Sequence, residues 1–266
     1  MEFLSVLLSS LLFIGSPTGV ALDQIAANAI RARVDGVEDL EVRVDNGSAV
    51  QLLQGKVDRL RIGARGVSLV PGFRIAIADL ETDTIDLDIG ALQQGQVVLD
   101  RPFQGAVHLV LTAEDLNTFL QSRAFTDQLS NIRINLDNAA QSREASRYRL
   151  ENPQVTFLGD NRLRVEIDLF DQVLEESLPI EAETGLSVEN GHRLILVEPQ
   201  VVVDGEAAPE QLLETFTESL DDQLSLRQFE SQGITARVLS LALEPDGLDL
   251  ALWARIDPSF TERLTD

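Results

Sequence analysis

The sequence predicts an α+β fold in which long, curved antiparallel β-sheets are wrapped around two or three amphipathic helices. Apolar and polar residues alternate along 163–169, 178–188 and 248–256, and a period of two places successive side chains on opposite faces of a strand. Asn190-Gly191, between two such runs, is a strong hairpin signal. Three further segments carry apolar residues at helical spacing, so helices interrupt the strands.

The first half of the chain predicts two helices and a series of strands. An apolar stripe predicts a helix over 22–34. Thr112 is expected to cap the second helix, with Glu114 and Asp115 in its first turn, where the helix dipole favours acids. Alternating runs predict strands over 40–45, 54–70, 73–80, 84–89, 97–99 and 107–111.

The second half predicts a second β series and a third helix. Pro209 is expected at the first turn of that helix, because its missing N–H costs nothing there. Asp160-Asn161 and Pro245-Asp246-Gly247 are expected to be hairpin turns. The strands of this half are expected over 132–136, 148–150, 155–157, 163–169, 178–188, 194–203, 234–243 and 248–256.

This pattern divides the chain into three parts. Residues 1–21 are an apolar leader, residues 22–258 form a single domain with a possible seam near 138–146, and residues 259–266 are expected to be a loose tail. At 266 residues the chain can bury a sizeable core. Its lack of cysteine removes thiol nucleophiles, disulfides and thiolate metal sites.

The leader has two interpretations. Its apolar run, 3–14, is shorter than the roughly 20 residues that span a bilayer. A signal peptide would be cleaved after Ala21, but the leader carries no Lys or Arg and has Glu at position 2. Alternatively the segment is retained. The helical face that includes Leu4, Leu8 and Leu11 then contacts a membrane surface, or the segment packs on the domain itself.

Charge excludes one class of partner. The formal net charge is −23, so the chain repels nucleic acid backbones and no nucleic acid partner is expected. Residues 1–133 carry 17 acids and 11 bases, and residues 134–266 carry 27 acids and 10 bases. Contacts with anionic groups are therefore expected in the first half.

Three arginines are candidates for such contacts. Arg59, Arg61 and Arg65 share one face of the strand expected at 54–70, opposite Leu60 and Ile62. The three guanidinium groups could receive lipid phosphates. Alternatively, they form a solvated face paired with acids of a neighbouring strand, for example Asp86 and Asp88.

Trp253 is a second candidate contact, because it is expected on the polar face of its strand, together with Arg255. An aromatic side chain there could anchor at a lipid interface or could pack under a loop or helix.

The sequence indicates no catalytic residues, cofactor or metal. His108 and His192 occupy separate strand regions without metal-binding spacing, and no nucleophile elbow, phosphate loop or dinucleotide fingerprint occurs. Asp83, Asp86 and Asp88 lack the register of a calcium loop and are interpreted as a wet strand face.

Residues 53–67, LQGKVDRLRIGARGV, resemble the signature of the LmeA-like phospholipid-binding family, once classed as a domain of unknown function and of cyanobacterial and actinobacterial type. The helix at 22–34 and the strand with Glu41-Val42-Arg43-Val44 resemble the opening of that family. Residues 111–117, LTAEDLN, resemble its helix start "LT-x-x-DLN". The likeness covers roughly residues 22–256, and its motifs are structural rather than catalytic.

The resemblance implies a β-sheet cradle similar to tubular lipid-binding folds. It implies non-catalytic binding of a phospholipid or similar amphiphile, with lipid transport or support of envelope lipid and glycolipid assembly as wider roles. It also implies a cell-envelope protein, periplasmic or membrane-associated, although the acidic leader leaves the cytoplasmic face open. The alternative is a ligand-free structural or interaction protein of the envelope, and a hydrolase is a distant third.

Overall fold

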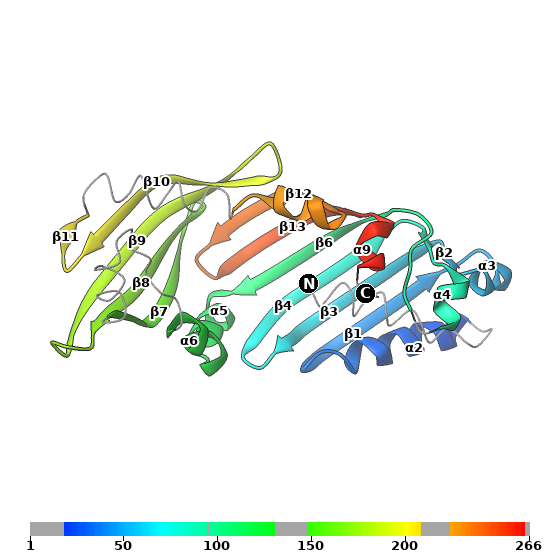
Figure 1. The fold of residues 1–266 in the computed structure, drawn as a ribbon, viewed down its shortest axis with the longest axis horizontal. Helices are drawn as coiled ribbons and strands as arrows, with labels where there is room; N and C mark the ends of the chain where they lie inside the picture. Colours follow the sequence, from blue (N-terminus) through cyan, green and yellow to red (C-terminus); the bar gives the residue numbers. More distant parts are fainter. Residues whose placement is uncertain (1–18, 95, 131–147, 209–223, 264–266) are drawn as a thin grey trace.

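The structure is a computed structural model that describes residues 19–94, 96–130, 148–208 and 224–263. Two large antiparallel sheets lie end to end along an elongated molecule (Figure 1). The antiparallel, β-rich fold with a few short helices is therefore confirmed. The wrapping of both sheets around helices stays a prediction.

The six-stranded sheet has the order β1-β3-β4-β6-β13-β12, and the five-stranded sheet has the order β11-β10-β9-β8-β7. The second sheet is thus inserted in the chain between β6 and β12. The strands of the first sheet are β1 (Gly36–Asp45), β3 (Arg59–Val70), β4 (Phe73–Thr82), β6 (Phe103–Thr112), β12 (Ile234–Glu244) and β13 (Gly247–Ile256). Those of the second are β7 (Tyr148–Gly159), β8 (Arg162–Asp171), β9 (Glu176–Glu189), β10 (Arg193–Val203) and β11 (Glu206–Ala207).

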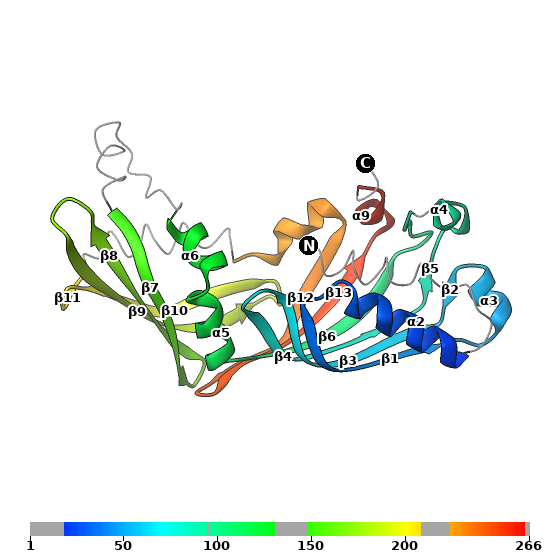
Figure 2. The same cartoon turned by 90° about the horizontal axis from the view of Figure 1, so that it is seen from below.

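Short helices accompany the sheets. The described helices are α2 (Gly19–Arg31), α3 (Ala49–Leu53), α4 (Ile89–Gln93), α5 (Ala113–Leu120), α6 (Arg123–Ser130), the 3₁₀ helix η2 (Leu226–Gln232) and α9 (Pro258–Glu262). Figure 2 shows η2 and α9 on one side of the six-stranded sheet. Within the described part of the chain, no helix has the length and apolar character that crossing a membrane would require.

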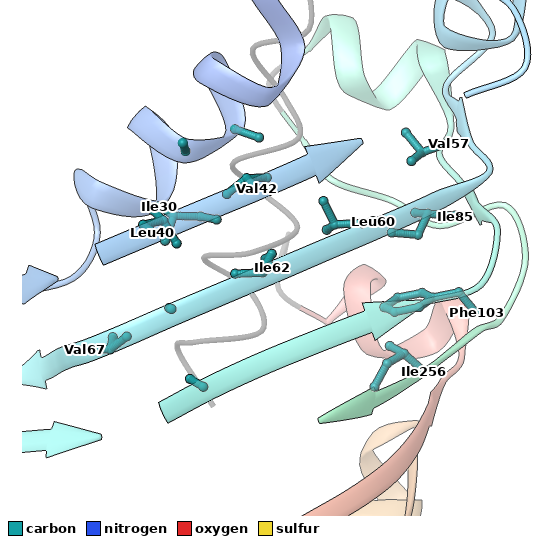
Figure 3. Packing of buried hydrophobic residues seen from close by; sticks show 14 of the residues in the cluster. Ile30, Leu40, Val42, Val57, Leu60, Ile62, Val67, Ile85, Phe103 and Ile256 are labelled. Carbon is teal, nitrogen blue, oxygen red and sulfur yellow. The ribbon is translucent and has the colours of Figure 1, made fainter. Parts of the chain in front are cut away.

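The main core lies on one face of the six-stranded sheet. Helix α2 packs its apolar stripe on β1 and contributes Ala26 and Ile30, which are 2% and 5% exposed. Leu60 and Ile62 of β3 belong to the same cluster, and Figure 3 shows them with Ile30 of α2 and with Leu40 and Val42 of β1. The apolar residues of α2 and the inward-facing residues of β3 therefore contribute to one core.

The hairpin turns are confirmed. Asp160 and Asn161 have φ values of 50° and 57° between β7 and β8, and Asn190 and Gly191 have values of 52° and 68° between β9 and β10. Asn, Asp and Gly tolerate this left-handed region best. The turn before β13 is also where it was predicted, since Glu244 pairs with Gly247.

Several predicted boundaries are wrong. The strand expected over 54–70 is interrupted, because α3 ends at Leu53 and β2 (Lys56–Val57) pairs with β5 (Ile85–Asp86) in a separate two-stranded sheet. The strand expected over 84–89 is only β5, and 97–99 contributes an isolated bridge from Leu99 to Leu87. The first helix begins at Gly19, three residues before the predicted start.

The tail is ordered where the structure describes it. Phe260 and Thr261 of α9 are 3% and 0% exposed, and Thr261 Oγ1 accepts a hydrogen bond of 3.1 Å from Leu99 N. The expectation of a loose tail is therefore wrong for the α9 segment, because Phe260 and Thr261 are buried at the end of the core.

Some expectations lie outside the described residues. These are the leader contacts of Leu4, Leu8 and Leu11, the strand at 132–136, the seam at 138–146 and the helix beginning at Pro209.

Candidate functional site

One face of the five-stranded sheet is apolar along four neighbouring strands. Leu169 pairs with Leu178, Val165 lies between Val155 and Ala182, and the same register continues into β10. The members of this face are Leu150, Val155, Phe157, Leu163, Val165, Ile167, Leu169, Leu178, Ile180, Ala182, Leu186, Val188, Leu194, Leu196, Val201 and Val203. We call this surface the β7–β10 apolar face.

The β7–β10 apolar face is only half covered. Phe157, at 5% exposure, is its one buried apolar member, and the other apolar members are partly exposed. The polar Thr184, which pairs with Leu163 on the same face, is also buried. The main core cluster of the described residues, in contrast, draws none of its members from β7 to β11. Soluble monomers rarely leave a large contiguous apolar surface in contact with water, and such surfaces usually mark binding sites.

The second sheet meets the first at the junction of β9 and β12. A cavity of about 300 Å³ lies there, and its lining is mixed: Leu186, Val188, Val238, Leu239 and Leu241, with Asn161, Ser187 and Ser240. Val238 N donates a 2.6 Å hydrogen bond to Gly191 O, which ties β12 to the β9–β10 turn. The junction is therefore a bonded contact between the two sheets beside a cavity of mixed lining.

Asparagine side chains fix the geometry of the junction. Asn161 Oδ1, in the β7–β8 turn, accepts a 2.8 Å hydrogen bond from Leu243 N of β12. Asn117 of α5 bonds to the backbone of Val155 in β7. The polar contacts hold the two sheets together without filling the apolar surface between them.

The opposite face of the five-stranded sheet is polar. Arg162 and Arg164 of β8 form ion pairs with Glu183 of β9 at 3.0 and 3.1 Å, and Arg164 also reaches Glu181 at 3.0 Å. Hydrogen bonds from Arg164 and then Arg162 lower the pKa of Glu183. The alternation in β8 and β9 thus places these ion pairs on one face of the sheet and the apolar residues on the other.

The three candidate arginines lie on the outer face of β3, opposite the buried Leu60 and Ile62. Each pairs with a carboxylate of a neighbouring strand: Arg59 with Glu81 at 3.2 Å, Arg61 with Asp45, and Arg65 with Asp79 at 2.6 Å. The hydrogen bond from Arg61 lowers the pKa of Asp45.

These ion pairs agree with the alternative interpretation, in which the arginines pair with acids of neighbouring strands. The partners are Glu81, Asp45 and Asp79 and not Asp86 and Asp88. The contact of Arg59, Arg61 and Arg65 with lipid headgroups stays a prediction.

The interpretation of Asp83, Asp86 and Asp88 as one wet strand face is wrong. Asp86 is 6% exposed and pairs with Lys56 at 3.5 Å and Arg101 at 3.3 Å. Asp83 Oδ1 accepts from Gln104 N, and Asp88 Oδ1 accepts from the backbone at the start of α4. Each carboxylate therefore has a separate structural role.

The remaining candidates are spread over the molecule. Trp253 is partly buried on the outer face of β13, where it lies between Ala106 and Arg237 in register. His108 Nε2 lies 3.0 Å from Asp249 Oδ1, whereas His192 is in the β9–β10 turn. No cluster able to hold a metal ion occurs among the described residues.

Sequence reasoning identified the alternating strands but not the β7–β10 apolar face as a site. Alternation alone is the same for a face that packs into a core and for one that stays half covered. The only available signal was the surplus of amphipathic strand over helix.

Together, these features define an open, double-sheet protein with one half-covered apolar face and charged outer faces. A family model described as LmeA-like phospholipid-binding matches residues 16–252, nearly the whole chain, and the protein therefore belongs to the LmeA-like phospholipid-binding family. No curated protein and no solved structure matches the chain.

Proposed function

We propose that this protein binds a phospholipid or similar amphiphile without catalysis, with the acyl chains on the β7–β10 apolar face. The observation that carries this proposal is the contrast between that face, where Phe157 is the one buried apolar member, and the tightly buried core of the six-stranded sheet. Membership of a phospholipid-binding family supports the same conclusion.

Burial of the exposed apolar surface would supply the free energy of binding. Removing apolar surface from water contributes about 25 cal/mol per Å². The face runs across four strands, so it offers an extended surface that suits acyl chains. Acyl chains need no polar partner, and the hydroxyl of Thr184 on this face already donates to the backbone oxygen atoms of Gly185 and Val197.

The wider role that we propose is transport or assembly of lipids in the cell envelope, by a periplasmic or membrane-associated protein. Support comes from the family alone. The alternative is a ligand-free structural protein of the envelope, in which the same face would stay empty.

Matched substitutions on the two faces of the sheet test the proposal. Ile167 lies on the apolar face and Ile195 on the opposite face, and both are partly buried. Ile167→Thr should weaken binding of a short-chain phosphatidylcholine, used below its micelle concentration, several-fold, because it places a hydroxyl among the acyl chains. Ile195→Thr should bind as the wild type does.

Calorimetric titration of the short-chain phosphatidylcholine measures both variants. Equal affinity of the two variants would argue against the β7–β10 apolar face as the site. No binding by the wild type would favour the ligand-free alternative.

A further inference from the structure

The turn between β8 and β9 carries two adjacent, branched apolar side chains that are exposed. Val173 and Leu174 are 70% and 59% exposed. Turns of this kind usually hold Gly, Asn, Asp or Ser, which satisfy the local backbone or adopt its dihedral angles. An isolated exposed apolar residue is common at protein surfaces, but two consecutive ones at the tip of a hairpin call for an explanation.

The turn is held in a defined shape. Asp171, which is 4% exposed, accepts hydrogen bonds at Oδ1 from Val173 N at 2.9 Å and Leu174 N at 3.2 Å. Glu175 N donates to Asp171 O at 2.9 Å, and Glu175 has a left-handed φ of 56°. The two apolar side chains are therefore presented by a bonded turn.

The turn also continues the β7–β10 apolar face. Leu169 and Leu178 form the last apolar pair of the hairpin before the turn, and Asp171 pairs with Glu176 at its base. Figure 1 shows this connection at the end of the molecule opposite α3. An amphiphile that enters or leaves the face at this end would pass beside Val173 and Leu174.

We propose that the β8–β9 turn is the membrane-docking tip of the protein, which inserts Val173 and Leu174 into the surface of a zwitterionic phospholipid bilayer. The inference deepens the proposed function, because it names where a lipid would enter the β7–β10 apolar face. Exposed apolar side chains at such a tip bind the interfacial region of a bilayer through the apolar area that they bury there.

The negative charge of the β8–β9 turn favours a zwitterionic membrane surface over an anionic one. The turn carries three acids, Asp171, Glu175 and Glu176, and Glu175 and Glu176 follow the exposed pair directly. The base at the turn is Arg149 of β7, which bonds to Gln172 at 3.1 Å, so acids outnumber it. Anionic headgroups would repel this end of the molecule, since the negative surface potential of such a membrane attracts bases and disfavours acids.

The opposite end of the molecule offers a matched control. Val50 and Leu53 of α3 are 61% and 75% exposed, so they form a second exposed apolar pair of the same residue types. They lie next to the packed end of the core, where Val57 and Ile85 are 2% and 0% exposed, and not next to the β7–β10 apolar face. Of these two exposed pairs, Val173 and Leu174 are the one that adjoins the β7–β10 apolar face.

Flotation of the full-length protein with phosphatidylcholine vesicles tests the proposal. The double variant Val173→Ser, Leu174→Ser should lose vesicle binding roughly tenfold or more, because two apolar side chains no longer enter the interface. The control Val50→Ser, Leu53→Ser should bind as the wild type does. Unchanged flotation of the turn variant, or a loss in the control alone, would overturn the proposal.

Vesicle composition tests the choice of surface. Replacing part of the phosphatidylcholine with phosphatidylglycerol should weaken wild-type flotation, and added salt should restore it by screening the repulsion. Stronger flotation with phosphatidylglycerol would overturn the assignment of a zwitterionic surface.

Binding of the short-chain phosphatidylcholine separates this inference from the proposed function. The turn variant should bind it with wild-type affinity, since the β7–β10 apolar face is unchanged. If the wild type floats through Val173 and Leu174 but binds no short-chain lipid, the proposed function is refuted and the docking tip is supported. If the wild type binds the short-chain lipid but the turn variant floats unchanged, the docking tip is refuted and the proposed function is supported.

Discussion

The side-chain amide of Asn117 bonds to both polar groups of the Val155 backbone. Asn117 Nδ2 donates to Val155 O at 2.8 Å, and Val155 N donates to Asn117 Oδ1 at 2.8 Å. Helix α5 packs against β4 of the first sheet and β7 of the second. One side chain thus completes the hydrogen bonding of a strand and joins the two sheets, which gives a structural reason for Asn at the end of the LTAEDLN motif.

Replacing Asn117 with Ala should lower the free energy of unfolding by about 1–3 kcal/mol, because a partly buried N–H and C=O of Val155 lose their partner. Urea denaturation measures the change. Thr118→Ala is the control, because Thr118 is the exposed neighbour on the same helix. An unchanged midpoint for Asn117→Ala would show that the amide does not stabilise the junction.

Gly55 and Gly205 provide a matched pair for backbone strain. Their φ values are 78° and 79°, but a Cβ on Gly55 would overlap the Leu87 carbonyl oxygen, whereas one on Gly205 meets nothing within 4 Å. Gly205→Ala should cost about 1 kcal/mol from the dihedral angle alone. Gly55→Ala should cost about 1–3 kcal/mol more, because of the overlap. Equal melting temperatures of the two variants would contradict this account of the LQGKV segment.

The triple variant Arg59→Gln, Arg61→Gln, Arg65→Gln distinguishes the two interpretations of the β3 arginines. Headgroup contact predicts weaker binding to anionic vesicles with unchanged melting. Ion pairing predicts a lower melting temperature with unchanged vesicle binding, since Glu81, Asp45 and Asp79 lose their partners. Because each arginine is already paired, we expect the second result. Vesicle flotation and thermal melting of the same sample decide between them.

Acid should remove the contribution of the ionised Glu183 to the free energy of unfolding. Its pKa is lowered from 4.5 by hydrogen bonds from Arg164 and Arg162, so the unfolded chain binds this proton more tightly than the folded one. The contribution is fully present above about pH 4.5 and is lost as the pH falls through the folded-state pKa.

Glu183→Gln should therefore lower the melting temperature at neutral pH and have progressively less effect in acid. Glu244→Gln, at an exposed carboxylate of β12, is the control. A difference from the wild type that stays constant with pH would contradict the role of the ion pairs.

The sequence predicted the elements whose causes are local. Alternation located β8, β9 and β13, the Asn190-Gly191 turn located a hairpin, and Thr112 caps α5 by accepting a 3.0 Å hydrogen bond from Asp115 N. Each of these features depends on residues within a few positions of one another. The resemblance carried by residues 53–67 and 111–117 correctly identified the family.

The sequence did not predict features that depend on distant partners. The strand expected over 54–70 breaks near Gly55 because that residue packs against Leu87, and Phe260 is buried because it packs into a core built mainly from the first 110 residues. The β7–β10 apolar face was missed as a site for the same reason. Whether an apolar strand face is covered depends on the rest of the fold and not on its own pattern.

The central claim is that the β7–β10 apolar face holds an amphiphile, and mass spectrometry of lipid extracts from the native protein tests it most directly. Protein purified without detergent should release phospholipid in near-stoichiometric amounts, and Ile167→Thr should release less than Ile195→Thr. An extract without phospholipid, together with no uptake of fluorescent phospholipid from vesicles, would contradict the account.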